Sequence, residues 1–271
     1  MTPLAHTRLV APDTNPTQDF YFLHGILGSR SNWRSLAKRL VARRPELGAV
    51  LVDLREHGDS GSRPPPHTLA ACAADLEDLA HVLGRPVAGV LGHSFGGKVA
   101  LRWSQERGAS LSQLWLVDST PGARPSRHGS ENLLEVVAAL RVMPRGWPTR
   151  QAFVERLVTM GFALSLAQWL AMNLMPQPAG GLLLALDLDA IEGLLDDYFA
   201  QDLWPAVEQS QVGALHLVIG GRSNVYDAED RDRAHALASE RAHVHVHVIA
   251  QAGHFVHVDA PDELLGLMLT P

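Results

Sequence analysis

The sequence has little of several features that would place it in other classes of protein. Cysteine occurs once, at Cys72, so no internal disulfide can form, and this thiol lies in an alanine-rich stretch typical of a buried helix. The chain contains no run of 18 uncharged apolar residues, and its first twenty residues lack the apolar segment of a secretory signal. We therefore expect a protein of a reducing compartment, the cytoplasm, without a membrane span.

Positive charge is also scarce. The 23 lysines and arginines are outnumbered by 29 aspartates and glutamates, which leaves a formal net charge of −6, and the basic residues form no stripe. Nucleic acid and anionic membranes are therefore unfavourable partners. The hydrophobic fraction of 46% is ordinary for a globular protein, and 271 residues suffice for one large domain or for a core with an insertion.

Short apolar runs alternate with helical stretches in the first and last parts of the chain. We expect strands at residues 4–10, 19–23, 48–54, 87–91, 114–117, 214–220 and 243–250. We expect helices at residues 33–43, 68–83, 95–107, 228–239 and 262–269. This alternation predicts right-handed βαβ units, and hence a mostly parallel, twisted sheet of about seven or eight strands with helices on both faces.

The alternation stops between Thr120 and about Gln211. Helical stretches are expected there at residues 131–141, 149–160, 164–175 and 187–199, separated by prolines, so the segment is predicted to be an all-helical insertion. The chain would then consist of a core, residues 1–123 and 211–271, and a helical cap, residues 124–210. Two cap residues, Trp147 and Trp169, are candidates for binding an apolar group of a substrate.

The stretch from Val87 to Lys98 passes from a buried strand through a turn into a helix. Its turn reads GHSFGG, with Gly92 and Gly96 two residues before and after Ser94. Such a turn, a nucleophile elbow, exposes the serine hydroxyl at the end of a strand and needs glycine where neighbouring segments approach closely. Because a chance match to G-x-S-x-G is common, the pattern needs support from the rest of the chain.

Other chemically useful side chains follow other strands. Asp118 follows one strand and His254 follows the last, while Ser223 and Asp227 follow the strand at residues 214–220. Because the carboxyl ends of parallel strands share one edge of a sheet, these groups can meet Ser94 there. An imidazole can take the proton of a serine hydroxyl, and a carboxylate can hold the imidazole in the required tautomer.

A glycine-containing turn after the strand at residues 19–23 supplies a further part of the site. The N–H groups of Ile26 and Phe95 are placed to stabilise an oxyanion. His24, Gly25 and His93 are expected to shape the site or to contact the substrate. The alternating histidines 243, 245 and 247 have no cysteine or carboxylate cluster beside them, so we expect no metal site.

These motifs together resemble the α/β-hydrolase superfamily, and within it the small esterase branch typified by the bacterial esterase YbfF and its mitochondrial relatives. The resemblance extends over nearly the whole chain. The matching stretches are FLHGILGSRSNW (22–33), DLREHGDS (53–60), GHSFGGK (92–98), LVDSTPG (116–122), GGRSNVY (220–226) and AGHFVHVDAPDEL (252–264). It implies an α/β-hydrolase fold with the helical cap inserted after the strand that ends at Asp118.

The resemblance also bears on which carboxylate is the catalytic acid. Many α/β-hydrolases carry an aspartate where this chain has Ser223, whereas the YbfF-like branch has a serine there and its acid after the preceding strand. It therefore favours Asp118, with Ser223 as an auxiliary that hydrogen-bonds His254. Asp227 remains the alternative acid.

We accordingly expect a serine hydrolase that acts through an acyl-enzyme on Ser94, without a cofactor, on small-molecule carboxylic esters. Acyl thioesters suit the same machinery. Carbon–carbon bond hydrolysis and perhydrolysis on the same scaffold are alternatives, as is a non-catalytic ligand-binding relative of this fold. The protein is expected to be a monomer or a dimer.

Overall fold

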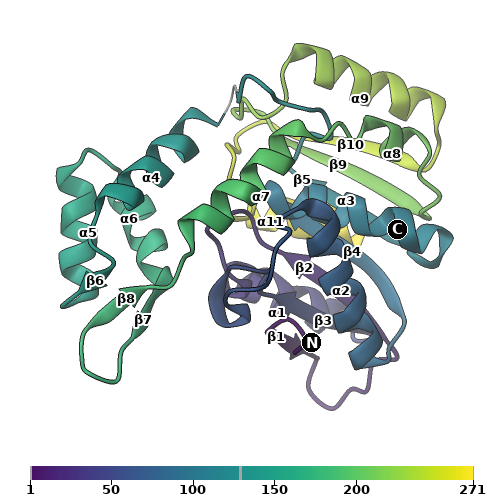
Figure 1. The fold of residues 1–271 in the computed structure, drawn as a ribbon. Coiled ribbons are helices and arrows are strands. Elements are labelled where there is room, and N and C mark those ends of the chain that lie inside the picture. The colour runs from purple at the N-terminus through teal and green to yellow at the C-terminus, as the bar shows by residue number, and fades with distance from the viewer. Residues whose placement is uncertain (1, 128–129, 271) are drawn as a thin grey trace.

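A twisted sheet of seven strands runs through the core (Figure 1). The computed structural model describes residues 2–127 and 130–270. The strands are β1 (His6–Leu9), β2 (Gln18–Leu23), β3 (Leu47–Val52), β4 (Val87–His93), β5 (Gln113–Val117), β9 (Ala214–Gly220) and β10 (Val244–Ile249). They lie in the order β1-β3-β2-β4-β5-β9-β10, and only β1 is antiparallel to its neighbour. The predicted mostly parallel sheet is confirmed.

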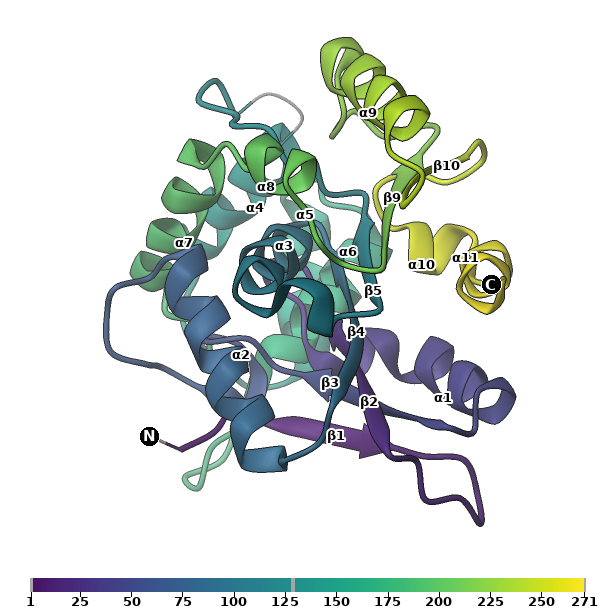
Figure 2. The ribbon, with the colours of Figure 1, turned by 90° about the vertical axis from the view of Figure 1, so that its right-hand side faces the viewer.

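Helices cover both faces of this sheet (Figure 2). One face packs against α2 (Leu69–Leu83), α3 (Phe95–Arg107) and α9 (Ala228–Glu240), and the other against α1 (Arg34–Arg43), α10 (Val256–Asp259) and α11 (Pro261–Leu269). Every residue of the central strand β4 is buried, as its unbroken apolar run requires between two helical layers. Over the described ranges, no helix combines the length and the apolar composition needed to cross a bilayer.

The cap lies between β5 and β9 and stands to one side of the core (Figure 1). Its helices are α4 (Glu131–Val142), α5 (Arg150–Thr159), α6 (Leu164–Leu170) and α7 (Leu188–Ala200). A further helix before β9, α8 (Trp204–Glu208), falls within the predicted cap, residues 124–210, but packs against α3 of the core. Single 3₁₀ turns occur at Arg30–Trp33, Gly58–Ser60, Gly108–Ser110 and Ala171–Asn173.

The prediction of an all-helical cap was wrong. A small antiparallel sheet joins β6 (Gly146–Trp147), β8 (Leu182–Leu184) and β7 (Leu174–Pro176), and the helix expected at residues 164–175 ends at Leu170. Gly180 and Gly181, with φ of 89° and 75°, form the turn between β7 and β8. Strands of two or three residues are too short to show a periodic pattern, so the sequence could not reveal them.

A buried lysine ties both ends of the cap to the core. Lys98, in the first turn of α3, is 1% exposed, and its Nζ donates hydrogen bonds of 2.8 Å to the carbonyls of Gly122, Tyr198 and Gln201. Gly122 lies where the chain enters the cap, and the other two lie where it leaves α7. Burial lowers the pKa of Lys98 to about 7, while the three carbonyl oxygens match the three N–H groups of an ammonium.

Several histidines are buried or half-buried in the core, where burial disfavours the charged imidazolium. It lowers the pKa of His24 and His257 to about 4 and that of His57 and His216 to about 3. These side chains are neutral in the folded protein at pH 7.

We expect Lys98→Met to loosen the attachment of the cap. The substitution leaves three carbonyl oxygens without their donor, two of them buried, and an unsatisfied buried polar group costs about 1–3 kcal/mol. The free energy of unfolding should fall by at least about 2 kcal/mol in urea titrations, and trypsin should cut the cap more rapidly. Lys38→Met, at the exposed lysine of α1, is the matched control. Equal stability of the two variants would contradict the inference.

We also expect the protein to lose stability in mild acid. His257 has a pKa of about 4 in the folded protein and 6.5 in the unfolded chain. As the pH drops, the unfolded chain therefore binds a proton before the folded protein does, and the free energy of unfolding decreases between pH 6.5 and pH 4. Each such group lowers the free energy of unfolding by about 2 kcal/mol between pH 7 and pH 5. His257→Leu should flatten this dependence by that amount, whereas His81→Leu, at an exposed position of α2, should not; parallel curves for the three proteins would refute the assignment.

Candidate active site

Ser94 lies between the end of β4 and the start of α3, where the backbone has φ of 51° and ψ of −119°. A non-glycine residue rarely adopts a positive φ, and such strain is concentrated at functional sites. A Cβ at Gly92 would lie 2.0 Å from the Gly96 carbonyl oxygen, and a Cβ at Gly96 would lie 2.4 Å from that of His24. Both glycines are therefore required by the close approach of the strand, the elbow and the neighbouring loop.

Asp118 follows β5 and is fully buried, also at a positive φ of 44°. Its Oδ1 accepts a hydrogen bond of 2.9 Å from the Gly220 N–H at the end of β9. Its Oδ2 accepts one of 2.5 Å from the Ser223 hydroxyl and lies 2.7 Å from Nδ1 of His254. The carboxylate is thus bound by groups from the loops after two other strands, which compensate for its burial.

Ser223 and Asp227, the two candidates from the β9–α9 loop, do not contact His254. Ser223 contacts Asp118 rather than His254. Asp227 caps the N-terminus of α9, where its Oδ1 accepts from the Asp230 N–H at 2.9 Å, and its Oδ2 lies 3.3 Å from Arg124. Only Asp118, of the two candidate acids, contacts His254 in the described structure.

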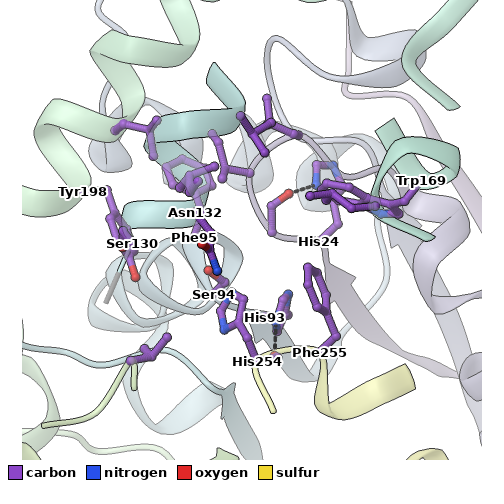
Figure 3. Close-up of a pocket in the computed structure, with 18 of the residues that line it drawn as sticks. His24, His93, Ser94, Phe95, Ser130, Asn132, Trp169, Tyr198, His254 and Phe255 are labelled. Atoms are coloured by element: carbon purple, nitrogen blue, oxygen red, sulfur yellow. Dashed lines mark hydrogen bonds between the residues drawn. The ribbon is translucent and has the colours of Figure 1, made fainter. Parts of the chain in front are cut away.

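His254 lies on the loop between β10 and α10, with its ring beside Ser94 (Figure 3). The contact of Nδ1 with Asp118 leaves Nε2 as the ring nitrogen available to the serine. His93 holds this loop, because its Nε2–H donates to the His254 carbonyl at 2.8 Å and its ring centre lies 4.6 Å from that of His254. Burial and the two neighbouring imidazoles hold the pKa of His93 well below its usual range, so His93 serves as a neutral support.

In the turn after β2, the backbone N–H of Ile26 points away from the hydrogen bonds that hold the turn together. The Gly25 carbonyl accepts from the Gly28 N–H at 3.0 Å and from Nδ1 of His24 at 2.7 Å. Because the N–H and C=O of a trans peptide point in opposite directions, these bonds direct the Ile26 N–H the other way, and it meets no acceptor among the described residues. Phe95 opens α3, so its N–H also lacks an intrahelical partner.

Two neutral histidines, His24 and His57, hold this turn by hydrogen bonds on the side of the core. Nε2 of His24 accepts from the Leu54 N–H at 3.1 Å, which places the proton on Nδ1. Nε2 of His57 accepts from the Leu27 N–H at 2.9 Å, and its Nδ1 donates to a carbonyl. A Cβ at Gly25 would lie 3.0 Å from His93, so this position also depends on close packing.

A cavity of about 450 Å³ opens over Ser94 between the core and the cap (Figure 3). From the core it is lined by His24, Gly25, Ile26, His93, Phe95 and His254, among others. The apolar lining residues of the cap include Leu133, Val136, Phe162, Leu166, Trp169 and Leu195. Polar groups also reach it, among them Arg124, Asn132 and Asn224. The cavity can therefore receive an apolar group beside the serine and a more polar group elsewhere.

The two candidate tryptophans have different positions. Trp169 lines the cavity, with its ring centre 5.9 Å from that of Phe255. Trp147 is in β6, packs edge-on against Phe153 at 5.3 Å, and is not among the lining residues. The structure thus gives no support to the expectation that Trp147 binds substrate.

The sequence analysis missed several aromatic residues of the cavity lining, among them Phe255 and Tyr198. Phe255 adjoins His254 and could have been found from that proximity. Tyr198, at the end of α7, packs on Phe95 at 5.9 Å, and burial raises the pKa of its phenol, opposed by a hydrogen bond with Ser94. Helical periodicity marks Tyr198 as an inward-facing residue but does not reveal which element it faces.

The histidines of β10, His245 and His247, stack with His216 of the neighbouring strand β9. His216 also lies parallel to Trp115 at 3.6 Å. Nδ1 of His216 and Nε2 of His247 lie 3.1 Å apart and form a hydrogen bond with each other, so these two nitrogens are already paired. Within residues 2–127 and 130–270, no group of three or more histidine, cysteine, aspartate or glutamate side chains could hold a metal ion.

Comparison with known proteins shows similarity along most of the chain. The chain is 29% identical over 269 residues to the sn-1-specific diacylglycerol lipase ABHD11 of Mus musculus. The aligned region covers 97% of this chain and 83% of the relative. It is 28% identical over 250 residues to the esterase YbfF of Escherichia coli strain K12, covering 90% and 88%.

Among solved structures, that of a marine microorganism esterase superposes with a TM-score of 0.84 over 98% of both chains, at 21% sequence identity. At that identity the likeness shows the fold alone. The sequence model of the alpha/beta hydrolase family matches residues 20–267, which is most of the chain. With its elbow, its sheet order and its inserted cap, this protein belongs to the α/β-hydrolase family.

Proposed function

We propose that this protein is a carboxylesterase-type serine hydrolase that cleaves small-molecule esters through an acyl-enzyme on Ser94. The observation that carries the proposal is the 2.7 Å contact between Asp118 and Nδ1 of His254, whose ring lies beside a serine on a strained elbow (Figure 3). Relatives along almost the whole chain are named as an esterase and a lipase, which supports hydrolysis of esters.

In this mechanism Ser94 attacks the acyl carbonyl while Nε2 of His254 takes the hydroxyl proton. Asp118 keeps the proton of the ring on Nδ1 and stabilises the imidazolium that forms. The carbonyl oxygen becomes an oxyanion, and the N–H groups of Ile26 and Phe95 donate to it. The tetrahedral intermediate collapses when His254 returns the proton to the leaving alcohol.

The second half repeats these steps with water as the nucleophile. His254 takes a proton from the water as it attacks the acyl-enzyme, the same N–H groups bind the second oxyanion, and the acid leaves as Ser94 regains its proton. No step needs a cofactor. Ser223 supports the cycle by donating to Oδ2 of Asp118, which helps to hold the carboxylate in the orientation that meets Nδ1 of His254.

The apolar lining of the cavity favours an apolar acyl group. Acyl thioesters can enter the same cycle, because a thiolate leaves more readily than an alkoxide. Nothing in the cavity specifically favours carbon–carbon bond cleavage or perhydrolysis. The cytoplasmic location and the monomeric or dimeric state remain predictions from the sequence.

Substitutions at the two candidate acids should separate their roles. Asp118→Asn should lower kcat by about three to four orders of magnitude, because the imidazole loses the carboxylate that holds its tautomer. Asp227→Asn, the matched control, should leave kcat within about twofold and keep the helix cap, because the asparagine Oδ1 can accept the same hydrogen bond from the Asp230 N–H. Hydrolysis of p-nitrophenyl esters of increasing chain length, and of acyl-CoA thioesters, provides the measurement, with Ser94→Ala as the inactive reference.

Near-normal turnover of Asp118→Asn with loss of turnover in Asp227→Asn would reverse the assignment. If the wild type hydrolyses none of these substrates and a fluorophosphonate fails to label Ser94, the protein is a non-catalytic member of the fold.

The two cap tryptophans offer a test of the acyl pocket. Trp169→Ala removes a ring from the cavity wall and should shift the preferred p-nitrophenyl ester toward longer or branched acyl groups. Trp147→Ala, in the same cap but outside the cavity, should leave the chain-length profile unchanged even if it lowers the melting temperature. A shift in both variants, or in Trp147→Ala alone, would contradict the placement of the pocket.

A further inference from the structure

The turn that carries the Ile26 N–H is held from two directions. Leu27, its next residue, is 1% exposed and has φ of 61°, a conformation that is costly for a branched side chain. On the core side the Leu27 N–H donates to His57 at 2.9 Å. On the other side the Leu27 carbonyl accepts a hydrogen bond of 2.9 Å from Nδ2 of Asn173, a residue of the cap.

Asn173 is itself firmly oriented. It ends the single 3₁₀ turn Ala171–Asn173, is 7% exposed, and its Nδ2 also donates to the Leu170 carbonyl at 3.2 Å. Its backbone carbonyl accepts from the Ala185 N–H at 3.0 Å, which joins the turn to the small sheet of the cap. The amide therefore faces Leu27 only when the cap is seated on the core.

We propose that Asn173 is a positioning residue that couples the seating of the cap to the geometry of the oxyanion hole. This inference rests on the proposed esterase function. Leu27 keeps its strained conformation because the peptides on its two sides are each hydrogen-bonded, one to the core and one to the cap. Without the cap bond, the peptide after Leu27 is held only by the hydrogen bond of 3.0 Å from the Gly28 N–H to the Gly25 carbonyl. The Leu27 carbonyl can then turn toward other donors, and the preceding peptides of the turn rotate with it.

A change in the direction of the Ile26 N–H affects mainly the stability of the transition state. A substrate carbonyl carries little charge in the ground state and gains a full negative charge in the tetrahedral intermediate, so a misdirected Ile26 N–H weakens binding of the intermediate far more than binding of the substrate. The cap thus takes part in catalysis through Leu27 as well as enclosing the substrate.

The experiment compares Asn173→Leu with Gln177→Leu. Both replace an amide of the cap by a similar apolar side chain, but the side chain of the half-buried Gln177 contacts only carbonyls of its own hairpin, at 3.4 and 3.5 Å. Asn173→Asp, which keeps the shape and removes the donor, is the second variant should Asn173→Leu fold poorly. Turnover is divided by the amount of Ser94 that a fluorophosphonate has labelled when the labelling reaction is complete, so that unfolded protein is not counted.

For Asn173→Leu we expect kcat to fall about tenfold, the effect of one hydrogen bond, with KM within about twofold of the wild type. The inhibition constant of butylboronic acid, which forms a tetrahedral adduct with the serine, should rise by the same factor as kcat falls. Asn173→Asp should lose at least as much, because its carboxylate faces the Leu27 carbonyl oxygen. Gln177→Leu should match the wild type in all three quantities.

Two results would overturn the inference while leaving the esterase assignment intact. One is an unchanged kcat per labelled serine with a lower melting temperature, which would make Asn173 purely structural. The other is a raised KM with unchanged kcat, which would make it a substrate contact. Absence of turnover and labelling in the wild type would instead refute the proposed function itself.

Discussion

The active-site region depends on one buried carboxylate. Asp118 has no exposed surface, and an unpaired carboxylate there would be strongly unfavourable. Its stabilisation comes from Gly220 at the end of β9, from Ser223 in the loop after β9 and from His254 in the loop after β10. The buried Asp118 carboxylate at the end of β5 therefore requires that the loops after β9 and β10 lie close to it. The same contacts hold the His254 imidazole beside Ser94.

A second constraint joins the cap to the catalytic elements. Lys98 belongs to the helix that starts after Ser94, and it binds both segments through which the chain enters and leaves the cap. Asn173 reaches from the cap to the turn that carries Ile26. The cap therefore rests on the two elements whose N–H groups are proposed to bind the oxyanion, and the cavity and the catalytic geometry depend on the same contacts.

Much of this arrangement could be predicted from local patterns. The turn from β4 into α3 is marked by glycines whose spacing is dictated by close backbone approach, and α3 and β9 have the predicted bounds. The long core helices α1, α2, α3 and α9 were found because their apolar residues repeat over ten residues or more, whereas the single turn of α10 was not predicted. The cap was harder, since its short strands carry no periodic signal and a run such as residues 182–184 fits several structures.

The sequence by itself determined the order of strands and helices and the residues that follow each strand, because apolar periodicity and glycine spacing are local properties. Only the tertiary structure decided which of these residues meet. It brought Asp118 and not Asp227 to His254, left Trp147 outside the cavity, and set Asn173 against Leu27. Such contacts join residues up to 146 positions apart, and they depend on how the cap packs on the core, which no local pattern encodes.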